Sequence, residues 1–353
     1  MGDLPTLGDY INYDKAMRMI TGIFAVVLVA LIAGVIIQWL VRFLLTFNYA
    51  HRLKYLGGLI GGVALTGIVF YLLLKGVKGT TIISPGSKEW IETHSMLLMA
   101  ICFVGFTLIS QLLVSVFKIN ILKVIVLSGT FALAMAFAGN DLVNFIGVPL
   151  AALGAFGFYR QTGDIDMYMG GLNTDVKTPV FILAAAGIIM MLALIFSKKA
   201  HNVLKTTVDL SRSEGADERF RPNTISKLMV RASVYLGRGL SYLLPRRISE
   251  HIEGRFDRPY VKDIKQRDVP AFDLVRASVN VVVPAIIIAM GTNSTLPLST
   301  TYTTFMVAMG SSLADRAWGL ESAVYRVSGV VRVILGWFAT ALIAFLSAAS
   351  LAI

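Results

Sequence analysis

The polar block from Gly139 to Asn144 is the first place where this sequence could do chemistry, because it interrupts a long apolar stretch. The block places the carboxylate of Asp141 between the amides of Asn140 and Asn144. A charged side chain is costly inside a membrane and usually faces a protein-lined cavity or pathway. Carboxylate and amide oxygens are also the ligands that small hard cations prefer. The pattern therefore predicts a cation site formed by these three side chains.

We expect the helix that carries this block to be interrupted at Gly139, because glycine tolerates backbone conformations that end a helix. Such an interruption is stable at membrane depth only where the backbone lines a cavity. In an alternative interpretation, Asp141 caps a helix while Asn140 and Asn144 bridge neighbouring helices. The first interpretation gives the block an ion to bind, and the second gives it only a structural role.

A second polar block follows Gly291 and carries several hydroxyl groups. Pro297 would fit the first turn of a new helix, where its missing N–H group costs nothing. Backbone N–H groups and the hydroxyls of Ser299, Thr300 and Thr301 would then converge at a positive helix end, which suits phosphate or a carboxylate. Taken alone, the block could equally be a polar hairpin between two spans. Two interrupted apolar segments in one chain, however, are typical of a transporter binding site.

Long apolar segments must position both blocks. The 353 residues are 56% hydrophobic and only 15% charged, whereas about a quarter of a soluble domain is charged. Five runs approach the ~20 apolar residues that cross a bilayer, namely 20–41, 55–74, 96–117, 179–196 and 327–353. Two longer runs, 121–158 and 272–313, contain the polar blocks. The sequence therefore predicts an all-α, polytopic helical membrane protein with two broken or re-entrant helices.

The excess of basic residues indicates membrane topology rather than nucleic-acid binding. The formal net charge is +11, but the Lys and Arg residues flank apolar segments and form no separate basic domain. Because positive flanks mark the cytoplasmic side, we place Arg42, Lys54 and Lys118 inside. The N-terminus and the acidic loop 164–175 are then outside. We expect a multi-pass protein of the cell (inner) membrane.

The predicted organisation has three parts. Residues 1-196 form transmembrane helices with the first polar block, residues 197-270 form a polar cytoplasmic insert, and residues 271-353 form transmembrane and re-entrant helices with the second block. Within the insert, apolar positions recur at helical spacing from Thr224 until Pro245 ends the pattern. This pattern indicates an amphipathic helix, either in the headgroup layer or in a small helical hairpin.

Nothing in the sequence indicates catalysis. The histidines at positions 51, 94, 201 and 251 lie outside the interrupted runs, and no HExxH or Ser–His pairing falls near the membrane centre. The single cysteine, Cys102, excludes an intrachain disulfide. We therefore predict no catalytic residues, no bound cofactor and no enzyme activity, including activity on a phosphate-bearing lipid.

Residues 138–144, Ala-Gly-Asn-Asp-Leu-Val-Asn, and residues 297–301, Pro-Leu-Ser-Thr-Thr, resemble the signature blocks of the inorganic phosphate transporters of the PiT family. Members of this family import phosphate with sodium ions or protons and are built from two inverted halves. The resemblance implies a phosphate site made of Asp141, Ser299, Thr300 and Thr301. It also implies that Asn140, Asp141 and Asn144 hold the coupling cation.

Several features differ from the family pattern. The usual Gly-Ala order is inverted at Ala138-Gly139, Leu142 replaces a valine, and Tyr302 stands where many members have histidine. Each block occurs once, and residues 24–325 look like the C-terminal half of a long bacterial member. We therefore expect one half of an inverted-repeat transporter, completed by a missing N-terminal half or by a second subunit. Import of another oxyanion such as sulfate, or a non-transporting membrane scaffold, are the alternatives.

Overall fold

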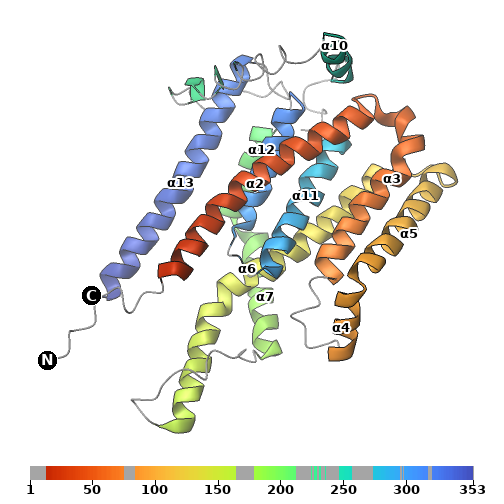
Figure 1. Ribbon diagram of the computed structural model, residues 1–353. Coiled ribbons are helices and arrows are strands. Elements are labelled where there is room, and N and C mark those ends of the chain that lie inside the picture. Colours follow the sequence, from red (N-terminus) through yellow and green to blue (C-terminus); the bar gives the residue numbers. More distant parts are fainter. Residues whose placement is uncertain are drawn as a thin grey trace.

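The chain folds into a bundle of helices in a computed structural model (Figure 1). The structure describes residues 13–74, 84–163, 179–211, 246–256, 273–294, 298–316 and 320–352, with residue 296 and a few residues between 224 and 235. Within these ranges every regular element is a helix, which confirms the predicted all-α class.

Six of the described helices are long and apolar enough to cross a membrane. They are α2 (Tyr13–Leu45), α3 (Tyr49–Val69), α5 (Ser95–Ser115), α6 (Ile121–Thr162), α11 (Leu274–Asn293) and α13 (Leu320–Ala352). A seventh span would be formed by α7 (Val180–Phe196) and α8 (Lys198–Ser211), which meet at a bend of 61°. Large apolar side chains are exposed along α2, α5 and α13, as on helices that face lipid. These features indicate a multi-pass membrane protein.

Shorter helices complete the described part of the chain. The π-helix η1 (Phe70–Leu74) continues α3, and α4 (Pro85–Thr93), α10 (Arg246–Arg255) and α12 (Thr300–Ala314) are the others. The described residues between 224 and 235 are helical, in agreement with the helix predicted there. The rest of that helix and the acidic loop 164–175 lie outside the described residues, so the three-part organisation stays a prediction.

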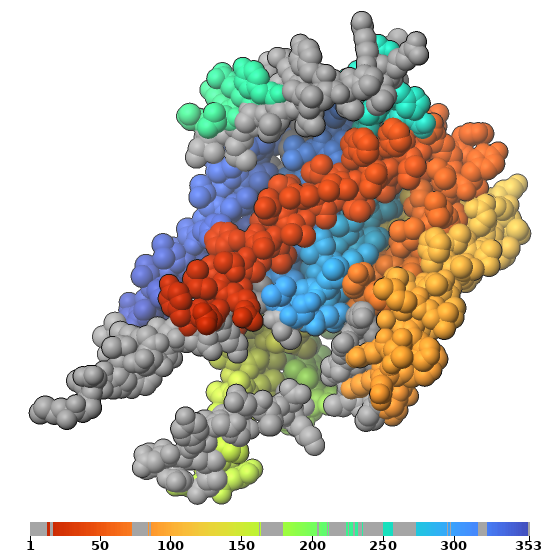
Figure 2. Space-filling model, viewed as in Figure 1, coloured from red at the N-terminus to blue at the C-terminus, as the bar shows by residue number. Residues whose placement is uncertain are grey.

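Close helix pairs build the core. α2 packs along α12, α3 along α5, and α6 along α11. In the space-filling view, α2 lies across the front of the bundle (Figure 2). Gly34 of α2 lies opposite Gly310 of α12 at their crossing, where a Cβ atom on Gly34 would come within 2.6 Å of the Val307 carbonyl oxygen. The two glycines therefore let the helix backbones touch, as small residues commonly do between membrane helices.

α11 and α12 form an antiparallel hairpin around the second polar block. α11 ends at Asn293 and α12 begins at Thr300, which confirms an interruption in this apolar run. Gly291 lies within the last turn of α11, where a side chain would collide with Leu298. Pro297 lies outside the described residues, and α12 begins three residues after it.

The predicted helix break at Gly139 is wrong. α6 is continuous over 42 residues from Ile121 to Thr162 and passes through the whole first block. Glycine in a helix costs only about 1 kcal/mol, and packing of α6 against α11 offsets a cost of that size. The polar side chains of this block therefore project from an intact helix.

Candidate functional site

The two polar blocks meet at Asp141 and Thr300. The Thr300 hydroxyl oxygen lies 2.9 Å from Oδ1 and 3.0 Å from Oδ2 of Asp141, so it donates its proton to both carboxylate oxygens. Thr300 is the first residue of α12 and is buried, while Asp141 projects from α6 and is half-buried. The contact thus joins the middle of one long helix to the start of a helix that follows a break.

Asn140 strengthens this junction. Its Nδ2 group donates to Asp141 Oδ1 at 3.1 Å and to the Leu298 carbonyl oxygen at 3.2 Å. Leu298 is held in turn by a buried apolar cluster with Ala136 and Ile288. The two bonds use both N–H groups of Asn140, so its side-chain oxygen is available for a further ligand.

The start of α12 brings only part of the predicted anion site together, because the helix begins at Thr300 and Thr301 is exposed. Ser299 is the N-cap residue, and its side chain accepts a bond from the Tyr302 N–H group at 3.4 Å. Tyr302 stacks on Trp337 of α13, with ring centroids 3.9 Å apart, which fixes the first turn of α12. A helix N-terminus carries partial positive charge. The Asp141 carboxylate contacts this end of α12 through the Thr300 hydroxyl.

Two of the predicted site residues lie outside this cluster. Thr301 is exposed, because it follows Thr300 by one residue and points about 100° further around α12. Asn144 is also exposed, one turn beyond Asn140 along α6. Their predicted roles in phosphate and cation binding stay predictions.

The cluster has the chemistry of a site for a monovalent cation or a proton. Among the described residues, no group of three or more His, Cys, Asp or Glu side chains could hold a metal ion. Asp141 is accompanied by neutral groups, namely the Nδ2 group of the Asn140 amide and the Thr300 hydroxyl. One carboxylate with neutral oxygen ligands suits a hard ion of low charge rather than a transition metal.

Comparison with known proteins identifies no relative of this chain. No family model, no curated protein and no solved structure matches the chain. The PiT resemblance therefore rests on residues 138–144 and 297–301 alone. A function for the chain has to be argued from the geometry around Asp141 and Thr300.

Sequence reasoning missed a backbone contact beside the break. The Asn293 side chain at the end of α11 donates to the Tyr71 carbonyl oxygen of η1 at 3.1 Å. A π-helical turn shifts the regular hydrogen-bond pattern and often occurs at functional sites. The contact fixes the end of α11 against η1.

Sequence reasoning also missed a buried ion cluster at the C-terminal end of α12. Arg42 served only as a topology marker, yet its side chain is 0% exposed and bridges Asp273 at 2.8 Å and Asp315 at 2.6 Å. Gln38 donates a further bond to Asp315 at 2.8 Å. One signal was present in the sequence, because Asp273 directly precedes an apolar run, as a helix cap does.

This cluster fixes the direction of the hairpin. Asp273 caps the start of α11 and Asp315 the end of α12, so both ends of the hairpin meet at Arg42. The 15 residues of α12 span about 22 Å, which places the Asp141–Thr300 junction about that far from Arg42. The site therefore lies at the turn between α11 and α12, away from the charged end.

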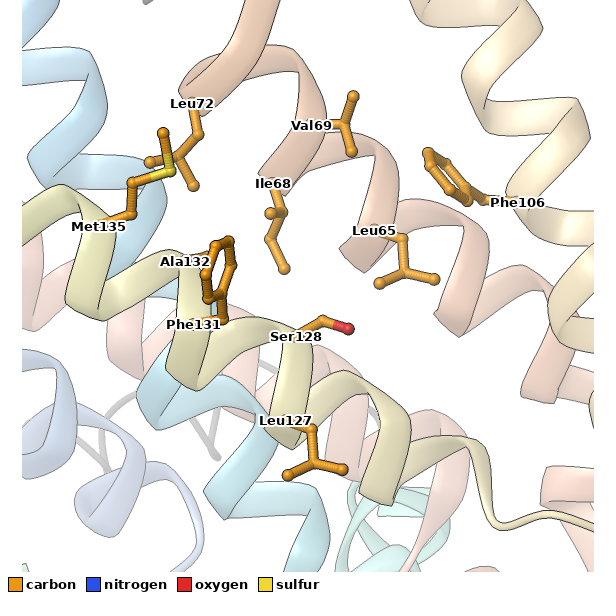
Figure 3. A pocket seen from close by; sticks show the side chains of 10 residues that line it. All are labelled: Leu65, Ile68, Val69, Leu72, Phe106, Leu127, Ser128, Phe131, Ala132 and Met135. Carbon is orange, nitrogen blue, oxygen red and sulfur yellow. The ribbon is translucent and has the colours of Figure 1, made fainter.

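An apolar pocket between α3, α5 and α6 is a poor candidate for the same ligands. It has a cavity volume of about 470 Å³ and is lined by Leu65, Phe106, Phe131, Met135 and other apolar side chains (Figure 3). Ser128 is the one polar residue among the ten that line it. A phosphate or a cation in this pocket would lose its hydration without gaining comparable contacts.

Proposed function

We propose that this chain is part of a secondary active transporter that imports inorganic phosphate together with a cation, either a sodium ion or a proton. The observation that carries the proposal is the bond between Asp141 of α6 and Thr300 of α12. It brings together a carboxylate, an amide and a hydroxyl at the positive end of α12, beside the turn of a hairpin of apolar helices.

The coupling follows from the competition for the Thr300 hydroxyl. While Asp141 is ionised and alone, it accepts that proton and occupies the positive end of α12. A cation or a proton on Asp141 weakens its hold on the hydroxyl, which can then donate to phosphate. Phosphate bound beside Asp141 in turn strengthens cation binding, because coupling between two ligands is reciprocal.

The remaining groups have assigned roles in this proposal. Ser299, Thr300 and Thr301 bind phosphate with the N–H groups of the first turn of α12. Asn140 and Asn144 provide amide oxygens for the cation beside Asp141. We further propose that α11 and α12 form the re-entrant element of one inverted half, and that a second half or a second subunit of the inner-membrane transporter covers Asn144 and Thr301.

Uptake of radiolabelled phosphate by proteoliposomes tests the proposal when sodium and pH gradients are imposed separately. We expect one of the two gradients to drive accumulation in wild-type vesicles and in Thr340→Val, which removes an exposed hydroxyl of α13 that donates to the Gly336 carbonyl oxygen of the same helix. Competition by sulfate and arsenate identifies the oxyanion, since hydroxyls and helix ends do not select phosphate by themselves.

A parallel binding measurement is needed because a chain that forms one half of the transporter could bind phosphate without transporting it. We expect calorimetry on the purified chain to show phosphate binding that tightens with the driving cation. Absence of both uptake and cation-dependent binding would contradict the proposal and favour a scaffold role. A scaffold also tolerates Asp141→Ala, whereas the transporter does not.

A further inference from the structure

A basic pocket lies at the end of the bundle where α3 begins, α5 ends and α6 begins. Its cavity volume is about 770 Å³. The polar residues of its lining include Tyr49, Lys54, Gln111, Ser115, Lys118 and Asn120. None of these residues belongs to the Asp141–Thr300 junction, so the pocket needs a separate explanation.

Among the residues that the structure describes, no ion pair balances the positive charge of the pocket. Lys54 and Lys118 are exposed, and neither takes part in the ion pairs of the described chain. The sequence contains no acidic residue between Asp14 and Glu89, and none between Glu92 and Asp141. All of α3 and the α5–α6 turn therefore lack carboxylates. The nearby Asp273, at the start of α11, is bound to Arg42.

The floor of the pocket is held in place before any ligand arrives. The Gln111 side chain of α5 accepts a bond from the Gly58 N–H group at 3.1 Å and donates to the Lys54 carbonyl oxygen at 3.0 Å. It thus contacts two backbone groups of α3 that lie one turn apart. Lys118 has a left-handed backbone with φ of 53°, which turns the chain from α5 toward α6. The two lysines are therefore carried on a rigid frame.

Apolar side chains continue from the pocket along the outer surface. Leu112, Val116 and Phe117 of the α5 end are 52%, 64% and 61% exposed, and Tyr55 of α3 is 75% exposed. A ligand for this surface has a negative head beside the lysines and a long apolar body along α5. Free phosphate has no such body. Lysines at the ends of membrane helices commonly reach toward lipid headgroups in this way.

We propose that this pocket binds the headgroup of an anionic phospholipid from the leaflet at the basic end of the bundle. The lysines contact the lipid phosphate, and the acyl chains lie against the exposed apolar side chains of α5. Basic pockets between membrane helices recognise anionic headgroups by the same combination of charge and shape. The inference is independent of phosphate transport.

The test titrates the purified chain in detergent with dioctanoyl phosphatidylglycerol, using dioctanoyl phosphatidylcholine as the neutral comparison. We expect the double variant Lys54→Gln, Lys118→Asn to bind phosphatidylglycerol on the order of tenfold more weakly than wild type. Asparagine is chosen at position 118 because it tolerates the left-handed backbone. If the double variant does not fold, each single variant carries the test with an expected loss on the order of threefold.

The control double variant Lys88→Gln, Arg160→Gln also removes two positive charges, one from α4 and one from the end of α6, and neither residue lines the pocket. We expect it to bind phosphatidylglycerol as wild type does. The proposal is overturned by wild-type affinity in the Lys54, Lys118 variant, or by an equal loss in the control. It is also overturned by equal binding of phosphatidylcholine, or by displacement of the lipid by equimolar inorganic phosphate, which would indicate a free-ion site.

Discussion

The Asp141 carboxylate of α6 accepts a hydrogen bond from the Thr300 hydroxyl of α12, although 159 positions separate the two residues in the sequence. Each residue comes from one of the two polar blocks, and each block interrupts a different apolar run. Ionisable side chains among apolar helices are costly and usually functional, which is why we propose this contact as the functional site.

Loss of the Thr300 hydroxyl should weaken the junction without unfolding the chain. Thr300→Val keeps the shape of the side chain but leaves the Asp141 carboxylate without this donor. We expect a loss of about 1 kcal/mol in the free energy of unfolding, the usual size for such bonds in membranes. Chemical denaturation in detergent measures it. Thr340→Val serves as the control, and equal stability of the two variants would contradict the role of the bond.

Arg42 should be far more important for stability than Arg52, a partly exposed arginine nearby. Arg42→Ala removes the guanidinium that donates to both carboxylate oxygens of the buried Asp315, and breaking a buried pair in this way costs about 3–5 kcal/mol. Arg52 contacts only the Leu44 carbonyl oxygen at the surface, so Arg52→Ala is expected to cost less than about 1 kcal/mol. Thermal stability of the two purified variants, measured side by side, checks this difference. Similar melting curves would show that the cluster does not hold the hairpin.

The same cluster predicts an acid-sensitive component of stability. Burial alone would raise the pKa of the Asp273 carboxyl, but hydrogen bonds and the charge of Arg42 outweigh burial and hold this pKa below its ordinary value. A lowered pKa in the folded state stabilises the fold above the unfolded pKa of about 3.9, and this contribution is lost as the pH falls further. We expect the stability difference between wild type and Asp273→Asn to shrink as the pH falls below about 4. A difference that does not change with pH would contradict the ion pair.

The crossing of α2 and α12 predicts opposite effects for two glycine substitutions. A methyl group at Gly310 would collide with the Leu31 carbonyl oxygen of α2, so Gly310→Ala should cost about 1–3 kcal/mol. At Gly336 of α13 no atom lies within 4 Å of an added Cβ, and Gly336→Ala should stabilise the helix by up to about 1 kcal/mol. The free energy of unfolding of each variant, measured by chemical denaturation in detergent, tests this difference. Equal destabilisation would show that the close crossing is not specific.

The sequence predicted the spans and several residues of the candidate site, but not the backbone geometry that positions them. Hydrophobic runs of membrane length predicted the spans, and the polar interruptions predicted Asp141, Asn140 and Thr300 as site residues. The interruption between α11 and α12 was predicted correctly. The interruption at Gly139 was not, because a glycine permits a helix to end but does not require it.

Long-range pairing was beyond the reach of sequence patterns. Arg42, Asp273 and Asp315 form one cluster only after α2 packs along α12, and no local periodicity records that packing. The same holds for Asn293 and the Tyr71 carbonyl oxygen, since a π-helical turn depends on backbone geometry rather than on residue type. The sequence also did not predict which polar side chains are exposed. Asn144 and Thr301 were predicted as site residues, and both are exposed.

The most direct test is the effect of the driving cation on phosphate affinity in wild type and in Asp141→Asn, each shown by gel filtration to be folded. We predict that the cation tightens phosphate binding by about 5- to 150-fold in wild type, the usual range for coupled ligands, and has no effect in Asp141→Asn. An Asp141→Asn variant that binds phosphate with undiminished cation dependence would contradict the account.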